Sequence, residues 1–349
     1  MKDISNNLID FASNDYLGFS KSKTILDEKQ QYFVQNGSVV YETLLENHIA
    51  KFHQTENAWI FNSAKDALLR FFGSIPQKDD LILYDELCHT PIRDAIQLSN
   101  AKSHKFQHND FEDLERLIEN LRPKSQNPKR IFIVTESVFS MDGDMPNLEE
   151  LTQLSRKYNC YLVIDESQSV GVFGEKGQGL VQNLQLQDKV FARIISFGNA
   201  LSCDGAAIIS SKEFKRHLVN FDSSFINKFG ISQNSLAKIL VTYKHLESEK
   251  QTIERLRENI VHFNQEVNLL GLKPMFVRSK SAIQSAIIPG NQNIKVIADQ
   301  FQEKGFDVKA VFSPEVPEGQ ERLRFCIHSF NTKEEISQLL GLLSTFVFG

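Results

Sequence analysis

The stretch Ile194-Ile195-Ser196-Phe197-Gly198-Asn199-Ala200-Leu201-Ser202 decides how the rest of this sequence is interpreted. A β-branched apolar pair leads into serine and glycine, which is the pattern of a strand that ends in a tight loop. A second stretch, Val163-Ile164-Asp165-Glu166-Ser167-Gln168, also places polar residues directly after an apolar run. Because open α/β sheets bind ligands beyond the carboxyl ends of their strands, we expect both strand ends to face a binding site.

Length and composition are those of an ordinary globular protein with two domains or one large one. The chain has 349 residues, of which 41% are hydrophobic and 24% charged. A net charge of −5 and the lack of a basic run argue against a nucleic-acid partner. No apolar signal region is present, and no stretch approaches the roughly 20 apolar residues that span a bilayer. We expect a cytoplasmic protein without a metal site, because its four cysteines are scattered and unpaired in spacing: Cys88, Cys160, Cys203 and Cys326.

Short apolar runs alternate with amphipathic segments from about residue 56 onward. Residues 131–134 and 161–164 are continuous and apolar, as strands covered on both faces should be, and residues 147–158 between them have helical periodicity. This alternation predicts an α/β fold with a mostly parallel sheet. We expect three parts: an N-terminal segment 1–45, a large domain 46–245 and a smaller α+β C-terminal domain 246–349.

The two strand ends resemble the cofactor floor of the pyridoxal-phosphate (PLP)-dependent α-oxoamine synthases. That family includes 8-amino-7-oxononanoate synthase and glycine C-acetyltransferase. The resemblance covers nearly the whole chain and is most specific in residues 8–18, 81–94, 131–180 and 318–332. It implies the fold-type I (aspartate aminotransferase-like) PLP-dependent transferase fold, PLP as cofactor, and a homodimer with sites at the subunit interface.

Two positions of the cofactor floor depart from the family. Asn199 stands where the family has the lysine that forms a Schiff base with the cofactor aldehyde. An amide nitrogen is not nucleophilic, because its lone pair is delocalised into the carbonyl group. Gln168 stands where the family has a histidine near the phenolic oxygen of the cofactor; a glutamine can donate a hydrogen bond but carries no charge.

Other positions match family residues that contact the cofactor. The resemblance implies that Asp165 bonds the pyridine nitrogen, that His89 stacks on the ring, that Ser196 contacts the phosphate and that Ser140 lines the site. Without the resemblance, Asp165 is a strand-end residue that caps a turn, Ser196 bonds its own backbone, and a lone histidine is structural.

The expected phosphate pocket is altered. The family presents a Ser-Gly pair and an aromatic residue, whereas this chain has Ser63, Ala64 and Lys65. A family threonine that reaches the phosphate across the dimer interface falls within residues 225–229, which contain Lys228 and no threonine. Both lysines could meet a phosphate, and both could equally be solvated surface side chains. The family segment that carries an arginine is shortened here to residues 37–41.

Arg322 and Arg324 resemble the family strand whose arginine grips the substrate carboxylate. Residues two apart on a strand share a face, and an arginine fork suits a carboxylate. We favour Arg324, which better matches the family position. The alternative is that both are ordinary exposed strand arginines.

The departures all concern the cofactor and substrate site. We therefore expect a catalytically degenerate homologue with weak or absent PLP binding. It would be a ligand-binding protein or a non-catalytic subunit, either as a homodimer or paired with an active paralogue, as serine palmitoyltransferase heterodimers contain a lysine-free subunit. Two alternatives stay open. One is an active acyltransferase that condenses an amino acid with an acyl-CoA through a relocated amine, Lys65 or Lys228. The other is an enzyme that uses the cleft without PLP.

Overall fold

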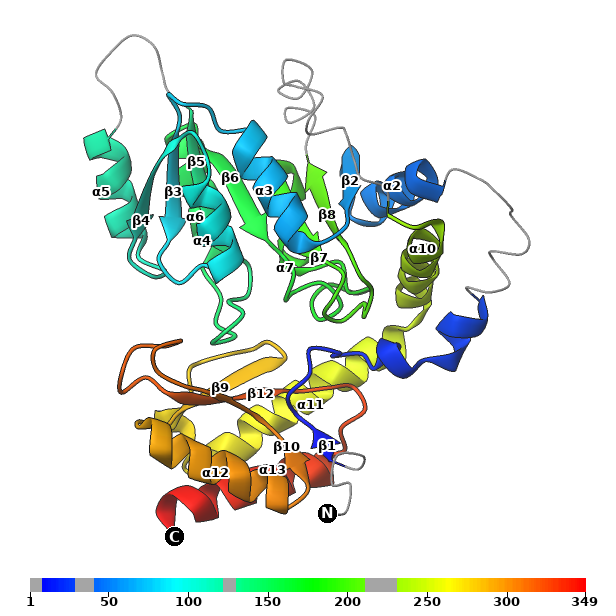
Figure 1. Cartoon of the computed structure of the whole chain (residues 1–349), viewed down its shortest axis with the longest axis vertical. Coiled ribbons are helices and arrows are strands. Elements are labelled where there is room, and N and C mark those ends of the chain that lie inside the picture. Colours follow the sequence, from blue (N-terminus) through cyan, green and yellow to red (C-terminus); the bar gives the residue numbers. More distant parts are fainter. Residues whose placement is uncertain (1–7, 29–40, 122–129, 211–230) are drawn as a thin grey trace. The chain divides into compact units, whose positions relative to one another are not determined.

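The computed structural model describes residues 8–28, 41–121, 130–210 and 231–349 (Figure 1). The shortened segment at residues 37–40 and Lys228 lie outside these ranges. Internal contacts divide the chain into two compact units. The small unit comprises residues 1–19, 140–144 and 249–349, and the large unit comprises 20–139 and 145–248. The first and last divisions along the chain thus fall after residues 19 and 248, and both the N-terminal strand and the segment 140–144 group with the C-terminal residues.

The large unit is built on a seven-stranded sheet with the order β2-β8-β7-β6-β5-β3-β4. Its described strands are β2 (Asn57–Phe61), β3 (Leu81–Asp85), β4 (Lys102–Phe106), β5 (Ile131–Glu136), β6 (Tyr161–Asp165), β7 (Ala192–Ser196) and β8 (Ala206–Ser210). Strand β8 is antiparallel to both of its neighbours, and the other strands run in one direction. The predicted mostly parallel α/β sheet is therefore confirmed.

Helices cover both faces of this sheet, because its central strands are apolar on both sides. The described helices of the large unit are α2 (Tyr41–Phe52), α3 (Ala64–Ser74), α4 (Thr90–Gln97), α5 (Phe111–Leu121), α6 (Leu148–Lys157), α7 (Leu180–Asn183) and α10 (Gln233–Ser248), with a 3-10 turn at Gln187–Lys189. A further 3-10 turn, Phe19–Lys21, spans the boundary between the two units. One apolar core forms beneath α3 and α4 and includes Val134 and Val163. The other forms beneath α5 and α6 and includes Ile133 and Ile164.

The small unit is α+β, as expected for the C-terminal part. Its three-stranded antiparallel sheet has the order β11-β12-β9, and β1 pairs in parallel with β10. The elements are β1 (Ile9–Asp10), α11 (Lys250–Leu269), a 3-10 turn (Lys273–Met275), β9 (Ile283–Ile287), α12 (Asn291–Glu303), β10 (Phe306–Asp307), β11 (Lys309–Val311), β12 (Arg322–Cys326) and α13 (Lys333–Phe348). In the part of the chain that the structure describes, no helix is long and apolar enough to cross a membrane.

A buried ion pair joins two central strands of the large unit. Glu166 follows β6 directly, and its Oε2 lies 3.0 Å from Nη1 of Arg193 on β7; the two side chains are 0% and 2% exposed. Arg193 Nη2 also donates to the His53 carbonyl at 2.7 Å. Glu166 Oε1 accepts from the Val181 N–H and the Ser169 hydroxyl, both at 2.9 Å. Both carboxylate oxygens of Glu166 and both terminal nitrogens of Arg193 thus have partners, as buried charges require.

We expect Arg193→Met to lower the free energy of unfolding by about 3–5 kcal/mol, because it leaves Glu166 charged and buried without compensation. Adding Glu166→Gln to this variant should recover part of the loss. Arg70→Met is the matched control, since Arg70 pairs with Asp66 on the partly exposed face of α3 and should cost below about 1 kcal/mol. Urea unfolding checks all three variants. Equal losses for Arg193→Met and Arg70→Met would contradict this account.

Candidate functional site

The polar residues predicted in the large unit gather at the carboxyl edge of its sheet. Asp165 ends β6 and pairs in register with Glu136, the last residue of β5. Ser196 ends β7 and pairs with Ala206 of β8, which also pairs with the last residue of β2, Phe61. Parallel strands bring their carboxyl ends to one edge, so residues far apart in the sequence meet there.

Ser167 forms hydrogen bonds with Asp165, Ser196 and Asn199. The sequence did not predict this role. Its N–H donates to Asp165 Oδ1 at 2.8 Å, and its hydroxyl accepts from the Ser196 N–H at 2.9 Å. Its carbonyl accepts from Asn199 Nδ2 at 2.7 Å. The signal available in the sequence was its place two residues after a strand-ending aspartate, the spacing at which aspartate bonds its own backbone.

The side chain of Asn199 has a structural task in this arrangement. It is half-buried, and its amide is already donated to the loop that follows β6. The Asn199 carbonyl accepts from the Ser202 N–H at 2.9 Å, and Ser202 has a φ of 48°, so a tight turn closes here. The loop after β7 is thereby tied to the loop after β6.

The pKa of Asp165 is higher than that of an ordinary aspartate. The group is half-buried. Burial raises the pKa of Asp165 to about 6, and the neighbouring charge of Glu166 adds to the rise, although hydrogen bonds from Ser167 oppose it. The carboxyl group therefore keeps its proton to a higher pH than an ordinary aspartate does. Perturbed pKa values of this kind are found at functional sites and in buried ion-pair networks alike.

His89 and Glu136 also meet at this edge. The His89 N–H donates to Glu136 Oε1 at 2.5 Å, and Glu136 is buried. His89 is exposed and stands at the start of α4 without a side-chain capping bond. Gln168, the predicted contact in place of a family histidine, is buried on the loop after β6.

Ser63, Ala64 and Lys65 lie at the start of α3. Ser63 caps the helix by accepting from the Asp66 N–H at 3.1 Å, and Lys65 is exposed. The N-terminus of a helix offers backbone N–H groups and a positive dipole end, which suit a phosphate. This segment follows β2, so it belongs to the same edge as Ser196.

The remaining predicted residues, Ser140, Arg322 and Arg324, belong to the small unit. Arg324 is 4% exposed. Its Nε donates to the Ser140 carbonyl at 2.9 Å, its Nη1 to Cys326 Sγ at 3.0 Å and its Nη2 to Asn14 Oδ1 at 3.0 Å. All three nitrogens of its guanidinium are therefore engaged within the unit.

Arg322 is similarly committed. It forms an ion pair with Asp142, and its Nε donates to the Gln320 carbonyl at 2.9 Å. Both arginines of β12 are buried, so neither is the exposed strand arginine that the sequence also allowed. Each one ties β12 to the segment 140–144.

The residues at the carboxyl edge fit PLP in part. Asp165 could bond a ring nitrogen, and Ser196 with the start of α3 could hold a phosphate. The position expected to bind the aldehyde holds Asn199, whose amide is occupied by the Ser167 carbonyl. The non-covalent contacts therefore fit the cofactor, whereas covalent capture at residue 199 does not. Among the residues that the structure describes, no group of three or more His, Cys, Asp or Glu side chains could hold a metal ion.

Comparison with known proteins defines the class. The model of the class I and II aminotransferase family matches residues 6–343, and the chain belongs to this family and, within it, to the α-oxoamine synthases. It is 34% identical to 8-amino-7-oxononanoate synthase of Emericella nidulans, over 97% of this chain and 89% of that protein. It is 29% identical to 8-amino-7-oxononanoate synthase 1 of Bacillus subtilis, over 96% of this chain and 87% of that protein.

Solved structures confirm the expected fold-type I PLP-dependent transferase fold. The 8-amino-7-oxononanoate synthase of Francisella tularensis matches with a TM-score of 0.81 and 28% identity, over 98% of each chain. Sphingomonas wittichii serine palmitoyltransferase matches with a TM-score of 0.87 and 22% identity, over 97% of this chain and 87% of that one. Another serine palmitoyltransferase structure of the same fold contains PLP.

The raised pKa of Asp165 predicts a pH-dependent stability. The folded chain binds this proton more tightly than the unfolded chain, so stability falls as pH rises from about 4 to about 6, and the cost is fully present above that window. Asp165→Asn should remove this dependence and be more stable than the parent protein at pH 7.5, by up to about 3 kcal/mol. Denaturant unfolding at several pH values measures it. Asp204→Asn, at an exposed residue, is the control; if both variants behave alike, the assignment fails.

Proposed function

We propose that this chain is a catalytically degenerate α-oxoamine synthase homologue that binds PLP weakly or not at all. It serves as a ligand-binding protein or as a non-catalytic subunit. The observation that carries the proposal is the contact of Asn199, whose Nδ2 donates to the Ser167 carbonyl at 2.7 Å. The resemblance gives this position to the family lysine. A group that is neither nucleophilic nor free cannot form the covalent bond to an aldehyde.

The energetic consequence is large. PLP, when bound, supplies an electron sink that stabilises a carbanion at the α-carbon of an amino acid. The chain would have to remove the α-proton with another group. Loss of a positioned general base costs roughly 10²–10⁴-fold in rate. Loss of covalent capture lowers the affinity for the cofactor as well, because only non-covalent contacts, such as those expected of Asp165, His89 and Ser196, remain.

Arg324, the residue favoured for gripping a carboxylate, donates to Ser140, Cys326 and Asn14. These three contacts fix the guanidinium within the small unit and use three of its five N–H donors. Arg324 therefore stays the candidate for a carboxylate of a ligand, and the proposal depends on Asn199 rather than on this residue.

The alternative is an active acyltransferase with a relocated amine. One contact of a described lysine favours testing it. Lys238 on α10 donates from Nζ to the Ser202 carbonyl at 2.7 Å, three residues from Asn199. An amine thus lies against the loop that carries Asn199. Lys65, at the start of α3, is the second described candidate. In this alternative the chain condenses an amino acid with an acyl-CoA.

We expect the purified protein, incubated with PLP, to show no visible absorbance band that survives dialysis. After borohydride reduction, mass spectrometry should find no pyridoxyl adduct on Lys65, Lys228 or Lys238. Asn199→Lys should acquire both signals, because it restores an amine at the expected position, whereas Asn199→Met, of similar length, should not.

A stable adduct on any lysine of the parent protein, or CoA release from an acyl-CoA and an amino acid at about 1 s⁻¹ or faster, would overturn the proposal. Circular dichroism confirms that each variant is folded, since both lose the hydrogen bond from residue 199 to Ser167.

The proposal extends to assembly. The resemblance implies a homodimer, or a heterodimer with an active paralogue that keeps the lysine. Light scattering on the purified protein measures the first: a mass near twice 39.9 kDa supports a homodimer, and a monomer leaves the heterodimer as the assembly to isolate from cells.

A further inference from the structure

A buried histidine, His328, lies in the small unit between the end of β12 and the start of α13. The ring of Phe330 stacks on it, with the centroids 4.6 Å apart and an angle of 13° between the planes. The ring of Tyr16, from the N-terminal residues, lies 6.4 Å away. Because the side chain of His328 is fully buried, both ring nitrogens have to find their hydrogen-bond partners inside the protein.

The Nδ1 atom of His328 faces an oxygen that can only accept. It lies 3.1 Å from Asn331 Oδ1, which also accepts from the His328 backbone N–H at 2.9 Å. The Asn331 amide keeps this orientation because its Nδ2 donates to the Asp10 carbonyl at 3.1 Å. Asn259 of α11 holds the same turn by donating to the carbonyls of His328 and Asn331 at 2.9 and 2.7 Å. Nδ1 therefore forms its hydrogen bond only when it carries a proton.

The Nε2 atom of His328 also faces acceptors. It lies 2.9 Å from the Ser13 carbonyl oxygen and 3.2 Å from Ser13 Oγ. The Ser13 hydroxyl donates its own proton to Asp10 Oδ2 at 2.6 Å, so its oxygen is left to accept. Nε2 needs a proton as well. Since a neutral imidazole has one ring proton, both bonds form together only in the charged imidazolium.

A carboxylate balances this charge through one hydroxyl group. Burial acts to raise the pKa of Asp10, but hydrogen bonds from Ser13 and Ala12 and the charge of His328 outweigh it, so the pKa is lowered. Asp307 of β10 pairs in register with Asp10 and is exposed. Burial and the charge of Asp10 raise the pKa of Asp307. Asp10 is thus the ionised partner that favours a proton on His328.

The remaining groups around the ring come from β12, α11 and the loop after β1. Burial raises the pKa of Tyr16 and of Cys326, so both keep their protons. The contribution of α11 is the uncharged amide of Asn259. Arg324 of β12 is a second cation, and its guanidinium donates to the Ser140 carbonyl, Cys326 and Asn14.

We propose that His328 is a proton-dependent clasp, which as an imidazolium holds residues 10–16 against the turn 328–331 and releases this hold when rising pH removes a ring proton. A neutral ring keeps one of the two bonds and places a lone pair against the other oxygen. Folding holds a proton that the unfolded chain gives up more readily, so the clasp adds stability at low pH and loses it as pH rises. Asn14 follows Ser13 and accepts from Arg324, so the clasp also positions a partner of that arginine.

Histidine-selective ¹⁵N labelling of the full-length protein tests the charge directly by NMR. His328→Gln identifies the signals of His328 by their disappearance. We expect both ring nitrogens to carry protons at about pH 7, where exposed histidines are mostly neutral. One protonated and one bare nitrogen at that pH would overturn the proposal. The measurement needs no PLP, so its failure is distinguishable from failure of the proposed function.

Hydrogen exchange on the parent protein tests the clasp without any variant. Between about pH 6 and about pH 9, we expect peptides covering residues 10–16 and 326–331 to lose about tenfold in protection beyond the intrinsic pH dependence of exchange, because one charge-assisted hydrogen bond is lost. Unchanged protection would overturn the proposal. An equal loss in residues 283–287 of β9 would also overturn it, because the whole unit would then be opening.

Two variants separate the clasp from ordinary packing. Asp10→Asn should move the loss of protection to lower pH, because it removes the carboxylate behind Ser13. His262→Gln is the matched control and should leave the loss unchanged. His262 lies on α11 of the same unit, and its Nε2 contacts the Lys333 carbonyl and Ser337 Oγ, which a neutral ring satisfies. The same pH dependence in both variants would contradict the assignment.

Discussion

The buried ion pair between Glu166 and Arg193 is the constraint on which the large unit depends. Two charges removed from water are tolerable only if each keeps its partners, so their geometry is fixed. Glu166 holds the loop after β6, and Arg193 reaches the end of α2 through the His53 carbonyl. A Cβ atom on Gly179 (φ 104°) would lie 2.7 Å from Glu166 Oε1, so only glycine fits there. The positions of Asp165 and Ser196, one residue before and three residues after these charges, follow from this pair.

In each unit, a group that the resemblance assigns to ligand binding forms internal hydrogen bonds. The Asn199 amide joins the two loops at the carboxyl edge through Ser167. In the small unit, Arg324 joins β12 to Ser140 and to Asn14. A donor bonded inside the fold stabilises it, and a ligand that needed the same N–H group would first have to break that bond. Stability and the proposed loss of activity thus arise from the same contacts.

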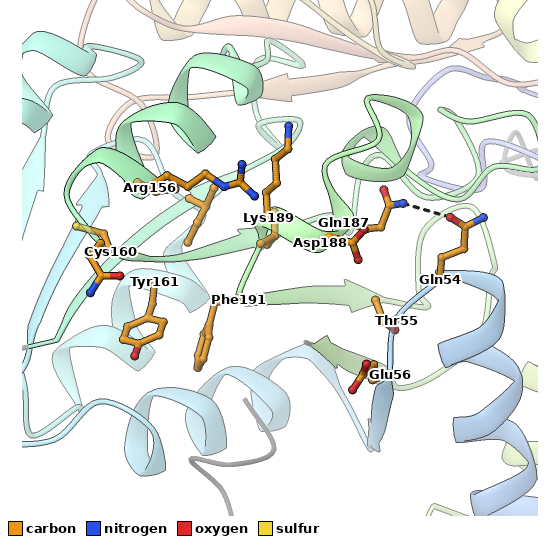
Figure 2. Close-up of a pocket in the computed structure, with 14 residues that line it drawn as sticks. Gln54, Thr55, Glu56, Arg156, Cys160, Tyr161, Gln187, Asp188, Lys189 and Phe191 are labelled. Atoms are coloured by element: carbon orange, nitrogen blue, oxygen red, sulfur yellow. Dashed lines mark hydrogen bonds between the residues drawn. The ribbon is translucent and has the colours of Figure 1, made fainter. Parts of the chain in front are cut away.

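The two edges of the large sheet differ in kind. At the carboxyl edge, Asp165 is half-buried and burial raises its pKa, so its charge depends on pH. At the amino edge, a pocket lies beside the start of β6 (Figure 2), and charged residues that line it, such as Arg156 and Lys189, are exposed to solvent.

The sequence by itself determined the apolar strands, the mostly parallel sheet and the amide side chain at residue 199, because hydrophobic runs and side-chain chemistry are local properties. Only the tertiary structure decided the partners. Glu166 and Arg193 lie 27 positions apart, and Arg324 and Asn14 lie 310 apart. Such pairs exist only because β6 lies beside β7 and because the N-terminal residues group with β12 in the small unit. No periodicity or spacing encodes those neighbours, so the commitment of Arg324 to internal bonds could not be predicted from the residues alone.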